Sequence, residues 1–414
     1  MNMIRGENDI AILGGIPAFS EPLHVGRPNI GNKDELLRRI SMMIDRCWLS
    51  NNGPMVKDFE SRVERYLNVK HCIAICNGTI ALEIAIKALE LRGEVIIPSY
   101  TFVATAHALQ WQAITPVFAD IDPETHNLDP ASVERMITPN TSGIIGVHLW
   151  GRPAPIDKLQ EIAKRNRIQL MFDASHAFGC TFGGRSVGMF GRCEVFSFHA
   201  TKFFNTFEGG AVVTNDDELA GKMRLMKNFG FSGYDNVIYS GTNGKMTEVC
   251  AAMGVTGMES VEEFIAVNRR NYHAYRDALS KFVGLRLLSY NETERCNYQY
   301  VVVEILNEFP LTRDEVIMVL HAENVLARKY FWPGCHNMMP YRALNPHAGM
   351  LLKNTMMVAE RVIVLPTGTS VTPEKIDRII SALRRARADV SNVKKACCNL
   401  QHGEKGCNNA GSNR

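Results

Sequence analysis

The residues best suited to covalent chemistry are a lysine and a nearby serine. Ser197 lies near the end of an apolar run that begins at Cys193, and Lys202 follows it by five residues. A lysine held between two buried strands is poorly solvated, and a desolvated amine of lowered pKa is the form that attacks carbonyl carbons. An isolated lysine is more often a solvated surface residue, so this interpretation needs support from other parts of the chain.

An acidic residue follows an earlier apolar run. Asp173 comes directly after residues 169–172, and ligands of open α/β sheets bind at the carboxyl ends of strands. A buried carboxylate needs a cationic partner, which a protonated pyridine nitrogen or a structural arginine could equally provide. His176, three residues later, either touches the same ligand or is a core histidine with satisfied hydrogen bonds.

A turn of small polar residues precedes both sites. Asn77-Gly78-Thr79 joins the apolar run 71–76 to a helical stretch at 79–91. Glycine lets an anion approach the backbone, and a helix N-terminus binds phosphate, although an ordinary capped turn has the same sequence. A phosphate turn, then an acid, then a serine and a lysine is the order that a pyridoxal 5′-phosphate (PLP) site requires.

An alternation of short apolar strands and helices positions these residues. It predicts an α/β fold with a mainly parallel sheet covered on both faces. We expect strands at 71–76, 95–97, 116–120, 143–148, 169–172, 193–198 and 211–214, and intervening helices at 79–91, 102–112 and 156–165.

The chain is expected to divide into four parts. These are an N-terminal arm rich in glycine and proline (1–35), a large domain (36–265), a smaller α+β domain (266–392) and a polar tail expected to be disordered (393–414). In the smaller domain we expect helices at 267–282, from 312 and at 373–387, and a strand at 298–305.

The composition is that of an ordinary globular protein. Of 414 residues, 46% are hydrophobic and 21% charged, and the balance of 46 basic to 43 acidic residues excludes a strongly basic nucleic-acid binder. Eleven cysteines without a C-x-x-C pair argue against a zinc site and indicate reduced thiols in a cytoplasmic protein. We therefore expect no metal and neither nucleic acid nor membrane as a partner.

Six short motifs occur in a characteristic order along the chain. They are Asn77-Gly78-Thr79, Pro98-Ser99-Tyr100-Thr101-Phe102, Asp173-Ala174-Ser175-His176-Ala177, Ser197-Phe198-His199-Ala200-Thr201-Lys202, Glu208-Gly209-Gly210 and Gly241-Thr242-Asn243-Gly244-Lys245-Met246. Together they resemble the DegT/DnrJ/EryC1/StrS family of sugar-nucleotide aminotransferases over about residues 10–390. The resemblance implies a fold-type I PLP transferase: a large domain with a mainly parallel seven-stranded sheet, a smaller α+β C-terminal domain, and a homodimer with active sites at the subunit interface.

The resemblance also implies site roles. Lys202 would bind PLP covalently as a Schiff base, Asp173 would pair with the pyridine nitrogen, and Phe102 would stack on the ring. In a small branch of the family that deoxygenates sugars, histidine replaces this lysine, so Lys202 argues against that branch. The other expected cofactor contacts are Gly78, Thr79 and Ser197 at the phosphate, His176 near the ring hydroxyl, and Asn243 reaching the phosphate across the dimer interface.

Two aromatic segments remain as candidates for binding the sugar. Tyr330, Phe331 and His336 lie in a loop that either covers the core or closes over the sugar, and its similarity to the family's loop favours the second. His148 and Trp150, at the end of a strand, are expected to line the sugar pocket on the same grounds.

The sequence therefore predicts a PLP-dependent aminotransferase that converts a nucleotide-linked keto-deoxysugar to the amino sugar, with L-glutamate as donor. The loop at 330–336 looks most like that of family members forming 4-amino-4,6-dideoxyglucose, so dTDP-4-keto-6-deoxy-D-glucose aminated at C-4 is the expected substrate. Amination at C-3 or a UDP-linked substrate is the near alternative. A nicotinamide dehydrogenase lacks support because no strand precedes G-x-G-x-x-G, and a non-catalytic protein on this scaffold would be expected to have lost Lys202 or Asp173.

Overall fold

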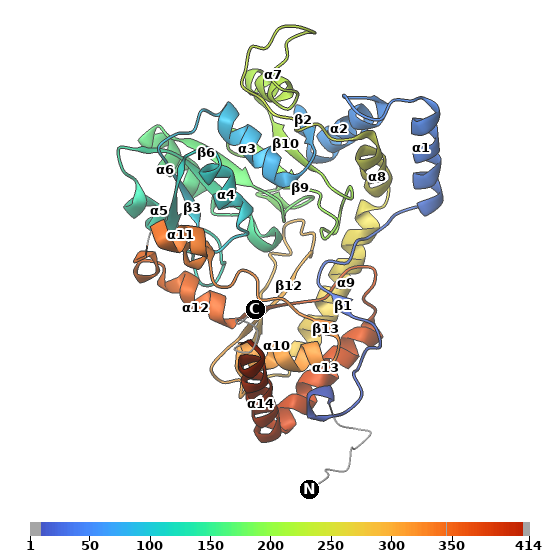
Figure 1. Cartoon of the computed structure of the whole chain (residues 1–414), viewed down its shortest axis with the longest axis vertical. Helices are drawn as coiled ribbons and strands as arrows, with labels where there is room; N and C mark the ends of the chain where they lie inside the picture. The colour runs from blue at the N-terminus through green and yellow to red at the C-terminus, as the bar shows by residue number, and fades with distance from the viewer. Residues whose placement is uncertain (1–9, 345, 409–414) are drawn as a thin grey trace.

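The chain forms a large and a small domain joined by one long helix (Figure 1). The structure is a computed structural model that describes residues 10–344 and 346–408. The joining helix, α9 (Val261–Leu279), packs its first turn against the core of the large domain through Phe264 and its last turns against the small domain through Tyr275. The boundary predicted between residues 265 and 266 falls inside this helix.

The large domain is built on one seven-stranded sheet. Its order is β2-β10-β9-β6-β5-β3-β4, in which β10 runs antiparallel to both neighbours and all the other pairs are parallel. This confirms the predicted mainly parallel sheet. The strands are β2 (His71–Ile75), β3 (Glu94–Pro98), β4 (Thr115–Ala119), β5 (Thr141–Val147), β6 (Gln169–Asp173), β9 (Glu194–Ser197) and β10 (Gly210–Thr214).

Helices cover both faces of the sheet because its strands are apolar on both sides. In β2, for example, Ile73 packs into one core cluster and Ala74 into another, as the alternation of side chains along a strand requires. One face carries α3 (Gly78–Ala88), α4 (Ala104–Gln110) and α7 (Asp217–Met226). The other carries α2 (Pro54–Leu67), α5 (Pro130–Met136), α6 (Ile156–Asn166) and α8 (Glu248–Met258), with α1 (Lys33–Asp45) packed on α8. A two-stranded hairpin, β7 (Thr181–Phe182) and β8 (Arg185–Ser186), follows β6.

The small domain packs helices on a three-stranded antiparallel sheet. The sheet consists of β11 (Leu285–Leu287), β12 (Val301–Ile305) and β14 (Val362–Leu365). Its helices include α10 (Arg313–Ala322), α12 (Lys353–Arg361) and α13 (Pro373–Ala388). The short helix α11 (Met339–Leu344) lies instead against the large domain, where Tyr341 is buried in the same core cluster as residues of α3 and α4. The N-terminal arm lies on this domain, where β1 (Leu23–His24) pairs in parallel with β13 (Val325–Leu326).

The tail expected to be disordered is instead a helix over most of its length. Residues Val390–Asn408 form α14, and Val393 and Cys397 are buried in the core of the small domain. These two residues are one helical turn apart, so they lie on one side of the helix and give it an apolar stripe to bury. The prediction overlooked this spacing because the surrounding composition is polar; residues 409–414 lie outside the described part of the chain.

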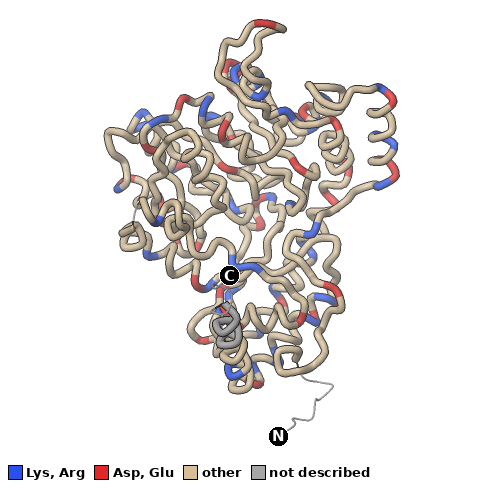
Figure 2. Tube along the Cα trace, viewed as in Figure 1, with Lys and Arg blue, Asp and Glu red and all other residues tan. Residues whose placement is uncertain are grey.

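Charge is spread evenly over the molecule. Figure 2 shows basic and acidic residues interspersed along the trace in both domains, which matches the nearly balanced composition. Among the described residues, no helix combines the length and apolar character needed to cross a membrane.

Candidate active site

The turn between β2 and α3 forms one wall of a cavity of about 590 Å³. Asn77 begins the helix as its N-cap, because its Oδ1 atom accepts a hydrogen bond of 2.9 Å from the backbone N–H of Ile80. A Cβ atom at Gly78 would lie 2.9 Å from Cβ of Ser197, so any other residue here would force the turn or the end of β9 to shift. The N-terminus of α3 thereby opens into the cavity beside two small hydroxyl residues, Thr79 and Ser197.

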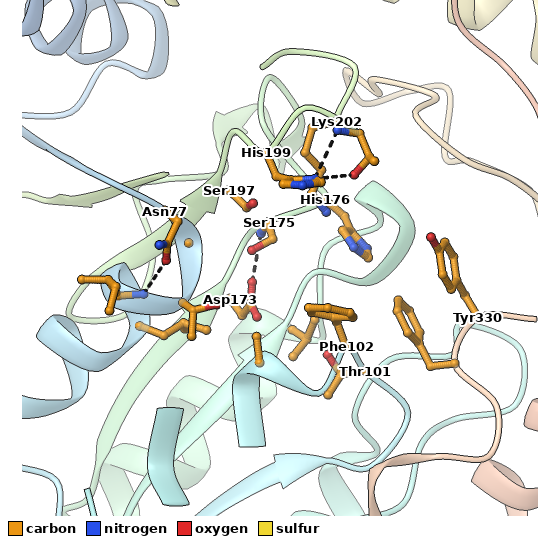
Figure 3. A pocket seen from close by; sticks show the side chains of 18 of the residues that line it. Asn77, Thr101, Phe102, Asp173, Ser175, His176, Ser197, His199, Lys202 and Tyr330 are labelled. Carbon is orange, nitrogen blue, oxygen red and sulfur yellow. Dashed lines mark hydrogen bonds between the residues drawn. The ribbon is translucent and has the colours of Figure 1, made fainter. Parts of the chain in front are cut away.

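The carboxylate of Asp173 is fixed by two donors. Asp173 is the last residue of β6, and its Oδ2 atom accepts a 2.9 Å hydrogen bond from the hydroxyl of Thr105 in α4. Its Oδ1 atom accepts a 3.0 Å bond from the backbone N–H of Ser175 (Figure 3). The carboxylate is nearly fully buried yet lines the cavity, so it offers a negative charge of fixed position to a ligand there.

Lys202 enters the same cavity from the loop between β9 and β10. Its backbone N–H donates a 2.8 Å hydrogen bond to the carbonyl oxygen of His199, and its Nζ atom donates a 3.4 Å bond to the hydroxyl of Tyr300. Burial lowers the pKa of Lys202 to about 8, although the negative charge of Asp173 acts in the opposite direction. A substantial fraction of the amine is therefore neutral near pH 8, as attack on a carbonyl carbon requires.

His176 is a neutral histidine at the edge of the cavity. Burial, and secondly the charge of Lys202, hold the pKa of His176 well below its usual range. Its Nδ1 atom accepts a 3.2 Å hydrogen bond from the backbone N–H of Trp150, which assigns the proton of the neutral ring to Nε2. His176 can therefore donate one hydrogen bond to a ligand.

Aromatic rings form the opposite wall of the cavity. Phe102, Tyr330 and Phe331 all line it, with ring centroids 6.5 Å apart between Phe102 and Phe331 and 5.1 Å apart between Tyr330 and Phe331. Figure 3 shows Phe102 and Tyr330 around the same cavity as Lys202 and Asp173. The hydroxyl of Tyr100 donates a 2.6 Å hydrogen bond to the carbonyl oxygen of Tyr330, which ties the small-domain loop to the large domain.

Three residues expected to contact the sugar lie outside the cavity lining of this chain, so their contact with the sugar stays a prediction. The ring of His148 is fully buried, with Nε2 3.1 Å from Glu194 Oε2 and Nδ1 accepting from the backbone N–H of Ala154. Trp150 stacks behind the aromatic wall, 5.2 Å from the ring of Phe331.

His336 is the third of these residues. Its Nδ1 atom lies 2.6 Å from the hydroxyl oxygen of Ser99, and its side chain is buried. The polar side-chain atoms of His148 and Trp150 all have partners within the protein, whereas Nε2 of His336 is buried without a hydrogen-bond partner among the described residues. The three side chains support the walls of the cavity.

Asn243 also lies away from the cavity in its own chain. Its backbone forms an antiparallel bridge with Asn228, in the loop that connects α7 and α8. Its contact with a cofactor phosphate across a dimer interface therefore stays a prediction.

Two residues of the site were missed from the sequence. Tyr300 immediately precedes β12 of the small domain, and Thr105 lies in α4, yet both contact charged groups of the cavity. Neither belongs to a strand-end motif, and only the folded chain shows that they reach Lys202 and Asp173.

Comparison with known proteins identifies the family. The family model described as the DegT/DnrJ/EryC1/StrS aminotransferase family matches residues 31–384. The chain belongs to this family. Its members are PLP-dependent sugar aminotransferases, and this chain is one as well.

Individual relatives of this aminotransferase cover nearly its whole length. It is 36% identical over 369 residues to the dTDP-4-amino-4,6-dideoxy-D-glucose transaminase of Shigella dysenteriae, covering 89% of this chain and 100% of that protein. It is also 36% identical to the GDP-perosamine synthase of Caulobacter vibrioides, covering 82% of this chain and 92% of that one. Among solved structures, DesI in the presence of its TDP-sugar product has a TM-score of 0.89 at 46% identity, covering 94% of this chain and 99% of DesI.

The cavity of this aminotransferase fits PLP chemically. The glycine turn and helix N-terminus complement a phosphate, because the first residues of α3 line the cavity beside the hydroxyls of Thr79 and Ser197. The buried carboxylate of Asp173 complements a protonated ring nitrogen, and the amine of Lys202, with its lowered pKa, complements an aldehyde.

Proposed function

We propose that this aminotransferase transfers the amino group of L-glutamate to C-4 of dTDP-4-keto-6-deoxy-D-glucose. The observation that carries the proposal is the 36% identity to the Shigella dysenteriae enzyme over that protein's full length, since its name specifies a 4-amino sugar linked to dTDP. The structural likeness to DesI, which was solved with a TDP-sugar product, supports the same nucleotide.

Each proposed cofactor contact is a residue that the cavity brings together. When bound, PLP supplies an electron sink that stabilises negative charge on the carbon losing a proton. The residues proposed to hold it are Gly78, Thr79 and Ser197 at the phosphate, Phe102, Asp173 and His176 at the ring, and Lys202 at the aldehyde carbon.

Lys202 would transfer the protons, and Tyr300 and Asp173 would support it. The Nζ atom of Lys202 takes a proton from the α-carbon of the amino donor, and in the second half-reaction returns one to C-4 of the sugar. The hydroxyl of Tyr300, 3.4 Å from this nitrogen, would orient the amine for both proton transfers. The carboxylate of Asp173 holds the proton on the ring nitrogen throughout.

We propose that the working unit is a homodimer with shared sites. In this arrangement Asn243 donates its side-chain amide to the cofactor phosphate of the other subunit, which a closed two-fold dimer allows at both sites equally. The proposal is supported by the position of Asn243, which lies in a loop and does not line the cavity of its own chain.

A GDP-linked sugar is the second candidate substrate. The equal identity to the GDP-perosamine synthase of Caulobacter vibrioides favours it, because that relative is named for a different nucleotide. The two candidates share the cofactor chemistry and differ in the nucleotide to which the sugar is linked.

A two-step experiment tests the proposed function. The purified protein should absorb beyond the protein band, and L-glutamate should shift this absorption as the amino group moves to the cofactor. The aminated form should then be offered dTDP-, UDP- and GDP-linked 4-keto and 3-keto-6-deoxyhexoses, with the position of the new C–N bond read by NMR. Amination of a 3-keto sugar, or of a GDP-linked sugar in preference to the dTDP-linked one, would refute the proposed substrate.

A further inference from the structure

The described part of the N-terminal arm, residues 10–32, runs from the small domain to the loop that carries Lys202. Its first part is held on the small domain, where β1 pairs with β13 and two backbone N–H groups of the arm donate to the carboxylate of Glu323 at 2.8 Å and 2.6 Å. Its last part, residues 26–29, contacts residues 201–205 of the large domain. The arm therefore touches the segment from which the reactive amine extends.

Asn29 is the central residue of this contact, and it is buried. Its Nδ2 atom donates a 2.9 Å hydrogen bond to the carbonyl oxygen of Phe203, the residue directly after Lys202. Its Oδ1 atom accepts from both the N–H and the hydroxyl of Thr369 in the small domain, at 3.0 Å and 2.8 Å. Its own carbonyl oxygen accepts a 2.9 Å bond from the side-chain amide of Asn205. One residue thus joins the arm, the loop of Lys202 and the small domain.

The backbone of the arm also approaches the residue on the other side of Lys202. Gly26 has a φ of +78°, and a Cβ atom there would lie 2.6 Å from the carbonyl oxygen of Thr201. Glycine permits this conformation and this approach, whereas any side chain would force a shift. The residues immediately before and after Lys202 are thus both in contact with the arm.

The small domain binds the same stretch of backbone at a second point. The N–H of Phe203 donates a 3.4 Å hydrogen bond to Oε1 of Gln299, and Gln299 precedes Tyr300, whose hydroxyl accepts from the amine of Lys202. Both polar backbone groups of Phe203 are therefore bound by side-chain amides from outside its own loop. Hydrogen bonds of this kind hold a reactive group accurately, and a displacement of about 1 Å can cost about 10²-fold in rate.

We propose that Asn29 is a positioning residue that fixes the place of the Lys202 amine through the backbone of Phe203. This inference rests on the proposed role of Lys202, and Asn29 itself does not line the cavity. Because Oδ1 of Asn29 is bound to the small domain, the same contact makes the place of the amine depend on how the small domain sits on the large one. An asparagine with a merely structural role would only hold the arm in place, and its loss would lower stability without a specific effect on the amine.

The rate at which the full-length protein, freed of cofactor, captures PLP separates the two roles. The variant is Asn29→Ala and the matched control is Asn271→Ala in α9, which is also buried and donates to the carbonyl oxygens of Gly368 and Val371 in the same small-domain loop. Among the described residues, none of the hydrogen bonds of Asn271 reaches the loop of Lys202. Both variants lose a buried amide and should have a lower thermal unfolding midpoint. We expect capture to slow about tenfold in Asn29→Ala and to stay within about twofold of wild type in the control.

A single-turnover measurement with the PLP-loaded protein adds a second readout. The limiting rate of the absorption shift at saturating L-glutamate should fall about tenfold in Asn29→Ala. The glutamate concentration that gives half of this rate should stay within about twofold, because Asn29 does not line the cavity in which the donor binds.

Gly26→Ala disturbs the same loop independently of the asparagine. Its matched control is Gly14→Ala in the same arm, where φ is +100° and no atom lies within 4 Å of the added Cβ. Both variants strain the backbone, but only Gly26→Ala presses on Thr201, so only this variant should slow PLP capture.

The outcomes separate this inference from the proposed function. Equal capture rates in Asn29→Ala and Asn271→Ala would overturn the positioning role and leave the role of Lys202 standing. Where Asn29→Ala does not fold, equal rates in the two glycine variants would overturn it instead. If the wild type captures no PLP, or Lys202→Ala develops the same absorption as fast, the proposed role of Lys202 fails and the inference fails with it. Capture requires neither donor nor sugar, so none of these results depends on the proposed substrate.

Discussion

The Nζ atom of Lys202 lies 3.4 Å from the hydroxyl oxygen of Tyr300 and donates a hydrogen bond to it. Lys202 belongs to the large domain and Tyr300 to the small domain, so the reactive amine is positioned only when both domains are in place. Burial lowers the pKa of the lysine to about 8 and raises the pKa of the tyrosine far above its usual value. The pair therefore combines an amine that readily becomes neutral with a hydroxyl that keeps its proton.

The lowered pKa of Lys202 predicts how cofactor capture depends on pH. Only the neutral amine attacks the aldehyde, so the rate at which the cofactor-free protein captures PLP should rise with pH and level off above about 8. An exposed lysine would keep gaining rate toward the ordinary lysine value near ~10.4. Stopped-flow absorbance measures this rate, with a free lysine amide in the same buffers as a control for titration of PLP itself. A rate that still climbs between pH 9 and 10, beyond that control, would contradict the prediction.

Removal of the Tyr300 hydroxyl should slow catalysis without loss of the cofactor. Tyr300→Phe keeps the ring that packs 4.6 Å from His176 and 5.3 Å from Trp150, but it leaves Lys202 without its partner. We expect kcat to fall by about tenfold, the worth of one hydrogen bond to a charged or reacting group. Steady-state kinetics and the PLP absorption band test this together. Unchanged kcat across the pH range would show that the hydroxyl does not orient the amine.

The strand-end residues could be predicted from the sequence because sheet geometry leaves little choice. Once 169–172 and 193–198 are recognised as parallel neighbours, Asp173 and Ser197 must emerge at the same edge of the sheet. The seven strands of the large sheet are mostly short apolar runs bounded by turns, which is the pattern that sequence reasoning detects best.

The direction in which a side chain points could not be predicted from the sequence in the same way. His148 stands at the carboxyl end of a strand, as Asp173 does, but its ring turns inward to Glu194, a partner 46 residues away whose location the sequence does not reveal. Tyr300 shows the converse: nothing within its own aromatic stretch distinguishes it from Tyr298, and only the packing of the small domain on the large one brings it to Lys202.

Asp173→Asn should abolish most activity while the fold is retained. The asparagine carbonyl can still accept from Ser175, and its amide can donate to the hydroxyl of Thr105, so the buried hydrogen bonds are replaced. The negative charge facing the ring nitrogen is lost, and we expect kcat to fall at least about 10²-fold. Comparison of kcat with the thermal unfolding midpoint is decisive. A fall in kcat of only a few-fold, with the midpoint unchanged, would remove Asp173 from its proposed role.

A methyl group at Gly78 should lower the stability of the protein and weaken its binding of the PLP phosphate. In Gly78→Ala the added Cβ would meet Cβ of Ser197 at 2.9 Å, so one of the two must move. We expect the free energy of unfolding to fall by about 1–3 kcal/mol and PLP to bind more weakly. The matched control is Gly221→Ala in α7, where no atom lies within 4 Å of the added Cβ and helix propensity favours alanine. Equal PLP affinity in the two variants would show that the turn does not hold the phosphate.

A subunit-mixing experiment tests whether Asn243 serves the partner's site. In a heterodimer of Asn243→Ala and Lys202→Ala subunits, a shared-site arrangement gives one site with both lesions and one with none. Random exchange makes about half of the dimers mixed, each with one intact site, so activity should return to about a quarter of wild type. The alternative is that Asn243 serves only the turn before Gly244, for which asparagine is well suited. In that case each site of a heterodimer carries one of the two substitutions. Activity should then stay at the mean of the two parent variants, even after differently tagged subunits have verified the exchange.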